Sequence, residues 1–300
     1  MKKLFLVDGS NLLFQMFYGM PARITAPDGH PVQGTVGFVG ALLKMLRAVQ
    51  PTHAAVFFDG ERTWQRKEQL AEYKANRPDY SGVPFWQTPF SQLADIRAAL
   101  DKLGIAHAET TCCEADDWFA AYARSMGEDT QLVISSWDSD LFQLVSERVS
   151  LLRYRGKATQ LYKAEEVLQR FGVQPSQFAA YKALVGDSAD NIRGVRGIGP
   201  KTAARLLAQH GDLAALLHAA ARAEVAPPRL AESILQSKQQ LLAAYGAIVL
   251  AGDVPLPFSL QQMQYAESGC TASGLLREMG LLAKAERSVP HDVPRTAGNK

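Results

Sequence analysis

The chain has 300 residues, of which 47% are hydrophobic, and its 32 basic and 30 acidic residues leave a formal net charge of +2. This length and composition suffice for a sizeable core, in one large α/β domain or in one domain with an appendage. No apolar run approaches the ~18–20 residues of a membrane span, and the apolar run at the N-terminus is too short for a signal peptide. The three cysteines lack CxxC spacing. This argues against a disulfide framework and a zinc site, and indicates a reducing cytoplasm.

Apolar runs of strand length alternate with segments of helical period in the first half of the chain. Strands are predicted at residues 4–7, 54–58, 132–135 and 149–153, and helices at 37–49, 90–103, 116–125 and 163–171. This alternation predicts an α/β fold in which a mostly parallel sheet is covered by helices on both faces.

The sequence changes character near residue 175. Beyond it the pattern is helical, with helices predicted at 175–186, 200–210, 213–223 and 228–250. The last stretch contains two prolines and a glycine and has little to bury, which predicts a loose tail. We therefore expect a sheet domain at 1–174, a helical region packed on it at 175–287, and a tail at 288–300.

A loop at residues 76–89 contains three prolines and three aromatic residues, Tyr80, Phe85 and Trp86. Long loops of this kind in a compact domain are often lids or binding loops. We expect its aromatic side chains to be exposed.

Acidic residues follow the predicted strands directly. Asp8 and Asp59 come immediately after the first two strands, and Asp138 and Asp140 lie just beyond the third. Ligands of open parallel sheets bind at the carboxyl ends of the strands, so these acids should converge there. A single aspartate at such a position is better explained as a turn former or helix cap, but several that converge are not.

Two further acidic clusters flank predicted helices. Glu114, Asp116 and Asp117 open a helix, where acids complement the helix dipole, so this cluster alone is explained equally well without a function. Asp187 and Asp190 lie at the C-terminal end of a helix, where negative charge is unfavourable unless a cation compensates it. Their spacing allows them to share one helix face.

All nine acids in one cleft would repel one another and resist ionisation. Divalent cations resolve this conflict, because oxygen-only ligand sets suit Mg²⁺ or Mn²⁺. None of the six histidines falls within these motifs. An oxygen-rich site that holds two ions ~3.5–4 Å apart is typical of phosphodiester hydrolysis.

A glycine-rich basic segment follows Asp190. Its glycines, Gly194, Gly197 and Gly199, permit a tight turn and the close approach of another backbone. Pro200 suits the first position of a helix, whose N-terminal N–H groups can bind a phosphate. Four bases give salt-sensitive affinity for a nucleic-acid backbone, without reading base edges: Arg193, Arg196, Lys201 and Arg205. The alternative, a helix–turn–helix corner in the core, is disfavoured by these charges.

A second basic stretch covers residues 66–77. As a helix it places Tyr73 and Arg77 on one side, with Arg66 one or two turns back. Mixed charge on a helix usually marks a solvated face, and the pattern alone favours that interpretation. The aromatic loop that follows favours function instead, since Tyr73 is suited to stack on any base.

Seven motifs occur in the order found in one nuclease family: VDGSN at 7–11, FD at 58–59, YKANR at 73–77, EADD at 114–117, DSD at 138–140, LVGDSADNI at 184–192 and GIGPKTA at 197–203. The chain resembles the 5′-nuclease domains of bacterial DNA polymerase I and the related phage and cellular flap endonucleases. The resemblance extends from Lys3 to about Pro257.

The resemblance implies a PIN-like sheet topped by a helical arch, here at about 62–92, which threads or clamps a single-stranded 5′ end. It also implies a helix–hairpin–helix element that grips duplex DNA, often with a monovalent cation such as K⁺ in the hairpin. The DNA-binding positions would then include Gly194, Gly197, Gly199 and Thr202, besides the bases Arg66, Arg193, Arg196, Lys201 and Arg205.

The same resemblance implies roles for the acids and the arch. Asp8, Asp59, Glu114, Asp116 and Asp117 resemble a first metal site, and Asp138, Asp140, Asp187 and Asp190 a second. Lys74 and Arg77 resemble residues that steer and polarise the scissile phosphate. Tyr73 resembles a residue that stacks near the cleavage point.

The sequence departs from the family pattern in four places. Cys112 and Cys113 precede the EADD motif, where a small or aromatic residue and a glycine are common. Ser136 and Trp137 stand where a Thr-Gly pair is common, and the bulky Trp137 beside the metals is expected to alter substrate fit. In the first arch helix, the Thr-Phe-Arg stretch of the family is replaced by TWQR at residues 63–66. The loop through residues 84–86 is longer and more apolar than usual.

These features predict a structure-specific 5′-nuclease that hydrolyses DNA by a two-metal mechanism, leaving a 5′-phosphate and a 3′-hydroxyl. We expect its partners to be DNA with 5′ ends, flaps or nicks, with no membrane, and the protein to be a cytoplasmic monomer. With no polymerase domain after it, we expect an independent nuclease or an excised domain. Two alternatives are a structure-selective DNA-binding protein with weak or absent catalysis and a PIN-like ribonuclease.

Overall fold

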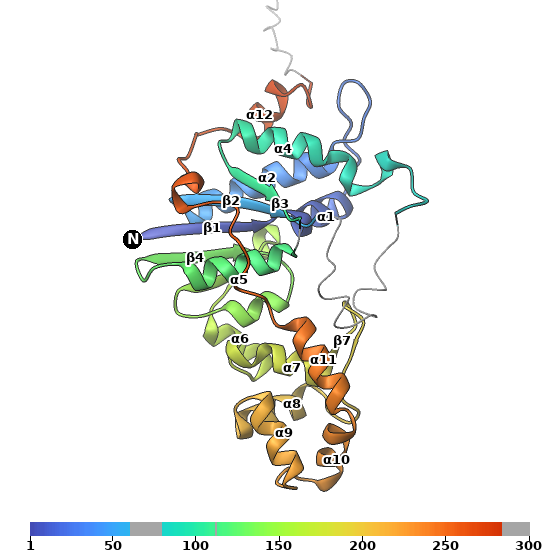
Figure 1. Cartoon of the computed structure of the whole chain (residues 1–300). Helices are drawn as coiled ribbons and strands as arrows, with labels where there is room; N and C mark the ends of the chain where they lie inside the picture. Colours follow the sequence, from blue (N-terminus) through green and yellow to red (C-terminus); the bar gives the residue numbers. More distant parts are fainter. Residues whose placement is uncertain (61–79, 112, 284–300) are drawn as a thin grey trace, which may run out of the picture.

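The computed structural model describes residues 1–60, 80–111 and 113–283, and its centre is a six-stranded sheet (Figure 1). The strand order is β3-β2-β1-β4-β5-β6, and every neighbouring pair is parallel except β5 and β6. The strands are β1 Lys2–Asp8, β2 His53–Phe58, β3 Ala106–Glu109, β4 Thr130–Ser135, β5 Val149–Arg153 and β6 Gln160–Tyr162. The predicted mostly parallel sheet is confirmed.

The central strands are apolar because both of their faces are buried. In β1, Leu4 and Leu6 pack into one hydrophobic cluster while Phe5 and Val7 pack into the other. The register pairs Val7 with Val56 of β2 and with Ser135 of β4, so these three strands end side by side. This alignment is what brings the residues after each strand together.

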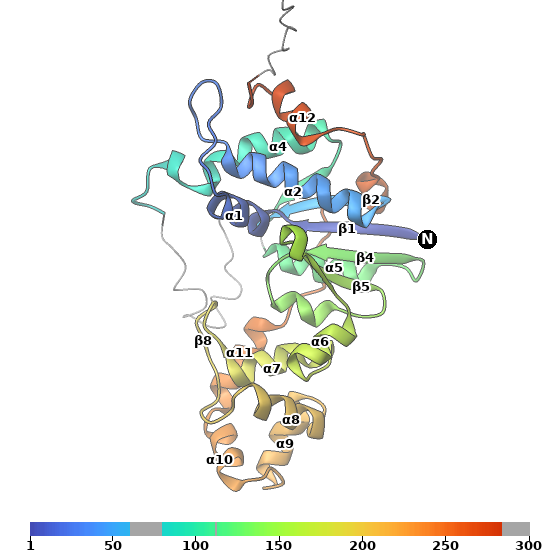
Figure 2. The same cartoon turned by 180° about the vertical axis from the view of Figure 1, so that it is seen from behind.

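Helices cover both faces of the sheet (Figures 1 and 2). One face carries α1, α2, α4 and α12, and the other carries α5 and α6. Their bounds are α1 Gly9–Gly19, α2 Gln33–Val49, α4 Leu93–Lys102, α5 Ala115–Ser125, α6 Ala164–Phe171 and α12 Ala272–Glu278.

Residues 178–248 form a helical region beyond α6 (Figure 2), and residues 249–271 run back to the sheet, where Gln264 pairs with His53 of β2. The hydrophobic core of the helical region is continuous with the sheet, since Phe178, Leu206 and Ile234 belong to the same cluster as Leu4. Two short paired strands, β7 Gly186–Asp187 and β8 Ile192–Arg193, interrupt the helices. The helices are α7 Phe178–Val185, α8 Pro200–His210, α9 Leu213–Ala221, α10 Pro228–Gln236 and α11 Lys238–Ile248.

The helix predicted at 90–103 begins within a 3₁₀ turn, Pro89–Gln92, before α4, and two further helix predictions differ from the structure. The single helix predicted at 228–250 is two helices, α10 and α11, which meet at Ser237. The helix predicted from residue 175 begins as a 3₁₀ turn, Pro175–Gln177, before α7. In both cases the helical period continues across the break, so the sequence pattern does not mark it.

The described part of the aromatic loop consists of two 3₁₀ turns, Phe85–Gln87 and Pro89–Gln92. Phe85 and Trp86 are exposed, as predicted, while Tyr80 packs against Phe14 and Phe90. Most of the predicted arch and all of the predicted tail lie outside the described residues. No helix in the part of the chain that the structure describes is long and apolar enough to cross a membrane.

Candidate active site

Asp8 lies at the point where three parallel strands end. It closes β1 and caps α1, and its Oδ1 accepts a hydrogen bond of 2.9 Å from the backbone N–H of Asn11. Its Oδ2 accepts one of 2.7 Å from the hydroxyl of Ser136, just beyond β4. One side chain thus joins the ends of β1 and β4.

The carboxyl group of Asp8 is buried, with 6% of the residue exposed. Burial, the neighbouring Asp59 and, more weakly, Asp138 raise its pKa to about 7, against the two hydrogen bonds that lower it. Asp59 and Asp138, which follow β2 and β4, therefore lie near Asp8 at the strand ends. Ionising this group in the metal-free protein is costly because it is buried and because Asp59 and Asp138 lie nearby.

The EADD motif opens α5 and connects to the end of β2. The backbone N–H of Ala115 donates a hydrogen bond of 2.9 Å to Oδ1 of Asp59. Glu114 is the N-cap of α5, and Asp116 lies in its first turn, where both residues are buried. The helix dipole stabilises these acids, but their burial beside Asp59 goes beyond what a helix cap requires.

Asp117 binds backbone groups with both carboxylate oxygens. Oδ1 accepts a hydrogen bond of 2.9 Å from the N–H of Ala251, and Oδ2 accepts one of 3.3 Å from the N–H of Glu114. Ala251 follows α11, far along the chain. Asp117 therefore fastens the C-terminal end of α11 to the first turn of α5, a contact that the sequence pattern did not indicate.

A buried lysine joins the second group of acids. Lys182 of α7 forms ion pairs with Asp140, beyond β4, and with Asp187, beyond α7. Burial lowers the pKa of Lys182, but these two carboxylates more than reverse that effect and raise it. Burial opposes ionisation of Asp187 as well, yet Lys182 holds the pKa of this carboxyl below its usual range.

Asp140 remains difficult to ionise despite this cation. Its burial raises its pKa to about 7, and Asp138 and Asp190 add to the rise, while Lys182 limits it. The sequence predicted that a cation compensates the acids at the C-terminal end of α7, and the ammonium group of Lys182 supplies part of that charge. Lys182 was missed because its neighbours in the sequence are apolar, although it lies five residues before Asp187.

Asp187 and Asp190 do not share a helix face. Asp187 lies in β7, and its Oδ1 accepts a hydrogen bond of 2.9 Å from the N–H of Ala189 within the turn that follows. Gly186, at φ +88°, ends α7 and turns the chain away from the helix. A turn rather than helical spacing therefore sets how these two acids lie, and Asp190 is the more buried of the two.

The acids suit a divalent cation by chemistry. They offer oxygen donors only, they are crowded, and two have a pKa of about 7, so a hard cation would replace protons and relieve repulsion. Among the residues that the structure describes, no three acidic, histidine or cysteine side chains already form a metal cage. Lys182 and the backbone bonds of Asp117 occupy several of the oxygens instead.

The glycine-rich segment forms a hairpin between α7 and α8. A Cβ on Gly194 would lie 2.2 Å from the carbonyl oxygen of Val185, so only glycine fits there, as the predicted close backbone approach requires. Pro200 is the first residue of α8, as predicted. Arg193, Arg196, Lys201 and Arg205 are exposed, and Thr202 is half-buried.

Four sequence-predicted site residues are not placed. Tyr73, Lys74 and Arg77, with Arg66, lie outside the described residues. Their expected roles at the base of the arch stay predictions.

Two family models match consecutive parts of the chain. The N-terminal resolvase-like domain of 5′-3′ exonuclease matches residues 3–172, and the C-terminal SAM fold of 5′-3′ exonuclease matches residues 173–269. The chain belongs to the 5′-3′ exonuclease family. The family membership inferred from the seven motifs is thereby confirmed.

Relatives in this family include both longer and comparable proteins. DNA polymerase I of Rhizobium leguminosarum is 37% identical over 287 residues, which cover 92% of this chain and 27% of that protein. The 5′-3′ exonuclease of Mycobacterium tuberculosis is 36% identical over 277 residues, which cover 85% of this chain and 86% of that protein. The chain spans between 27% and 35% of the length of its DNA polymerase I relatives.

Solved structures share the fold of this 5′-3′ exonuclease family member. T5 5′-exonuclease with bound zinc aligns with a TM-score of 0.68 at 23% identity, covering 83% of this chain and 90% of that one. The catalytic core of Rad2 in complex with DNA substrate aligns with a TM-score of 0.58 at 16% identity, covering 93% of each chain. The predicted PIN-like α/β fold class is confirmed.

Proposed function

We propose that this member of the 5′-3′ exonuclease family is a structure-specific 5′-nuclease that hydrolyses DNA, acting both as a 5′-3′ exonuclease and on 5′ flaps. The observation that carries this proposal is the buried acidic cluster at the strand ends, in which two carboxyl groups have a pKa of about 7. A structural cluster of this kind would cost stability at neutral pH without a cation to bind. We expect its substrates to be DNA with 5′ ends, flaps or nicks.

The proposed cofactors are two divalent ions, Mg²⁺ or Mn²⁺. Asp8, Asp59, Glu114 and Asp116 would hold the first, with Asp117 supporting them, and Asp138, Asp140, Asp187 and Asp190 would hold the second. Bound ions of this kind lower the pKa of a bound water and stabilise the charge that develops on a phosphate. T5 structures of the same fold contain bound divalent metal ions, and one of them is a complex with DNA and metal ions.

The chain's own side chains would order this site. The Ser136 hydroxyl holds Asp8 in place, and the N–H of Ala115 holds Asp59. Lys182 would keep Asp187 ionised and limit the rise in the pKa of Asp140 until an ion arrives. Asp117, with both oxygens bound to the backbone, would act more by fixing the first turn of α5 than by direct ligation.

The proposed DNA interface has two parts. Arg193, Arg196, Lys201 and Arg205 with the hairpin glycines would bind the duplex backbone, and the hairpin would take a monovalent cation such as K⁺. Lys74 and Arg77 would steer the scissile phosphate, Tyr73 would stack near it, and Arg66 would contact the strand. We further propose a cytoplasmic monomer with the sheet domain ending near residue 174.

A 5′-labelled flap DNA tests the function. With Mg²⁺ or Mn²⁺ we expect release of the flap near the junction, and with EDTA none. Asp138→Asn and Asp187→Asn should each abolish cutting and spare DNA binding, whereas the exposed Asp253→Asn serves as a matched control. Cleavage retained in both active-site variants would refute the proposed site.

The same assay separates the two alternatives. Tight DNA binding without cleavage in either metal would favour the non-catalytic DNA-binding protein. Faster cleavage of labelled single-stranded RNA than of flap DNA would favour the PIN-like ribonuclease. The four exposed bases around the hairpin support binding to the backbone of a duplex, because exposed positive charge attracts phosphates.

A further inference from the structure

A buried arginine at the end of β5 has no part in the proposed chemistry. Arg153 is only 9% exposed, and its Nε has no hydrogen-bond partner among the described residues. Its guanidinium carbon lies 4.5 Å from the ring centre of Phe142 and 5.8 Å from that of Tyr162. Burying a guanidinium is costly, so the contacts that Arg153 does make require an explanation.

The polar contact of Arg153 is with Trp137, the residue directly before Asp138. Arg153 Nη2 donates a hydrogen bond of 2.9 Å to the carbonyl oxygen of Trp137. The guanidinium carbon also lies 5.5 Å from the centre of the Trp137 ring, within the range of a cation–π interaction. Arg153 therefore holds Trp137 by both its backbone and its side chain.

Trp137 is fixed from two other directions. Its backbone N–H donates a hydrogen bond of 3.1 Å to Oδ1 of Asn11 in α1. Its indole Nε1–H donates one of 2.9 Å to the carbonyl oxygen of Tyr154, which also accepts one of 2.8 Å from Gln15 of α1. The backbone N–H, the backbone carbonyl and the indole of this residue are thus all bound.

The turn that Trp137 occupies joins the two groups of acids. The hydroxyl of Ser136 donates to Asp8 and accepts a hydrogen bond of 3.0 Å from the N–H of Asp138. The carboxylate of Asp138 in turn accepts one of 2.8 Å from the N–H of Asp140. A rotation of this turn would therefore move Asp138 relative to both groups.

We propose that Arg153 and Trp137 form a clamp that holds the turn at residues 136–138 so that Asp138 faces the metal site. Arg153 is then a positioning residue for Asp138 rather than a catalytic one. This inference rests on the proposed function, because it assigns the acids to metal binding. Groups that orient metal ligands from behind typically contribute about 10- to 100-fold to metal affinity.

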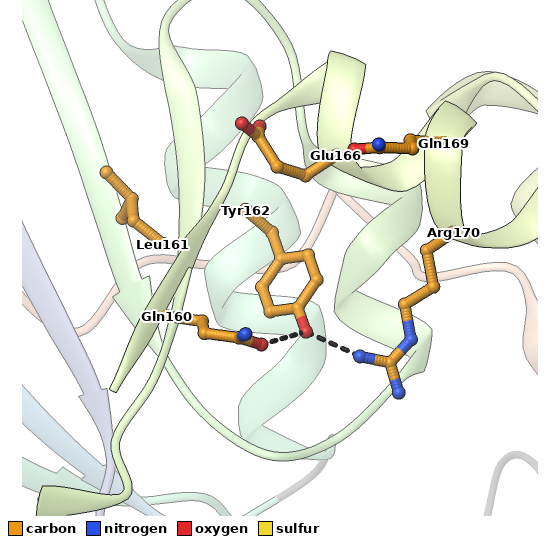
Figure 3. A pocket seen from close by; sticks show the side chains of 6 residues that line it. All are labelled: Gln160, Leu161, Tyr162, Glu166, Gln169 and Arg170. Carbon is orange, nitrogen blue, oxygen red and sulfur yellow. Dashed lines mark hydrogen bonds between the residues drawn. The ribbon is translucent and has the colours of Figure 1, made fainter. Parts of the chain in front are cut away.

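Arg170 provides a matched control. It packs on the same Tyr162, with its guanidinium carbon 5.7 Å from the ring centre and its Nη1 2.5 Å from the hydroxyl. Figure 3 shows that hydroxyl between Gln160 and Arg170, in a pocket of about 430 Å³ whose lining includes none of the nine acids. Arg170→Met therefore removes a cation from the same ring without touching Trp137.

The experiment measures binding of Mn²⁺ alone to the full chain, by electron paramagnetic resonance of the free ion. We expect Arg153→Met to weaken Mn²⁺ binding about tenfold, and Arg153→Lys to weaken it less because lysine keeps a hydrogen-bond donor. Arg170→Met should leave Mn²⁺ binding within about twofold of that of the unmodified chain, since it breaks no contact of Trp137. Unchanged binding in Arg153→Met, or an equal loss in Arg170→Met, would overturn the clamp.

Two further measurements keep the outcomes separate. If Arg153→Met does not fold by circular dichroism, Trp137→Phe replaces it. This variant keeps an aromatic ring at the position but loses the indole N–H that donates to Tyr154, so we expect roughly threefold weaker binding. Unchanged binding overturns the clamp. If the unmodified chain and Asp138→Asn bind Mn²⁺ equally, the proposed metal site itself fails.

Discussion

Replacing Asp8 by asparagine is expected to stabilise the metal-free protein above pH 7, although it removes a proposed metal ligand. Burial and the neighbouring Asp59 raise the pKa of Asp8 to about 7. A carboxyl group whose pKa is raised on folding favours the unfolded chain once it is ionised. Asparagine has nearly the same shape, can still accept the hydrogen bond from Asn11, and carries no charge.

The magnitude follows from the pKa. A rise from 3.8 to about 7, at about 1.4 kcal/mol for each pH unit, corresponds to about 4 kcal/mol. Below about pH 4 the group is protonated in both states, so it contributes no penalty there. The penalty grows as the pH rises from 4 to 7 and is complete above pH 7, where Asp8→Asn should gain most.

Urea unfolding in EDTA, at pH 5 and at pH 8, measures this difference. We expect the free energy of unfolding of Asp8→Asn to exceed that of the unmodified chain at pH 8 by a few kcal/mol, and by much less at pH 5. Added Mg²⁺ should stabilise the unmodified chain by mass action and the variant little. The exposed Asp253→Asn should show neither effect.

Two results would refute this reasoning. If Asp8→Asn is less stable than the unmodified chain at pH 8 in EDTA, then Asp8 contributes favourable contacts that outweigh its charge penalty. If the difference between the two proteins is the same at pH 5 and pH 8, the effect does not come from ionisation of Asp8.

Four further outcomes follow from the site and the hairpin. Lys182→Met should destabilise the metal-free protein by about 3–5 kcal/mol, because it leaves the buried carboxylate of Asp140 and the half-buried one of Asp187 without their cation. An unchanged urea midpoint in EDTA would contradict this. The Mg²⁺ concentration that half-saturates cleavage should fall as the pH rises from 6 to 8, because protons leave Asp8 and Asp140, whose pKa is about 7; a flat profile would argue that protons do not compete with the ion. Asp117→Asn should retain more cleavage than Asp116→Asn, because asparagine can still accept from Ala251, and equal turnover rates would assign Asp117 to direct ligation. Gly194→Ala should lower the free energy of unfolding by about 1–3 kcal/mol through overpacking. Gly199→Ala should lower it less, because a Cβ there would meet no atom within 4 Å. Equal urea midpoints of the two variants would show that the hairpin tolerates a Cβ at Gly194.

The sequence predicted the strands whose two faces are both buried, because continuous apolar runs mark them. It missed β3 and β6, the edge strands, in which polar residues such as Glu109 and Gln160 break the apolar run. It also missed α1, which begins at Gly9 directly after β1. Asp8 there ends a strand and caps a helix, so the capping interpretation is confirmed for this residue, while its role as a metal ligand stays a prediction.

The acids were found because their positions relative to strands and helices are visible in the sequence. The role of Lys182 was not predicted, because a lysine inside a helix gives no local sign of the carboxylates that surround it. The contact between Asp117 and Ala251 joins residues 134 positions apart, and such contacts depend on tertiary packing alone. Trp137 was recognised only as a departure from a family pattern, and its partner Arg153 lies at the end of β5, 16 residues later in the sequence.

The hydrophobic core has a consequence for how this protein can be divided. The two family models meet between residues 172 and 173, yet Phe178 and Leu206 pack in the same cluster as Leu4 of β1. Cutting the chain at that junction would expose apolar surface on both pieces and would separate Lys182 from Asp140. We therefore expect that the two parts, although distinct in architecture, fold together, and that neither is stable when it is expressed alone.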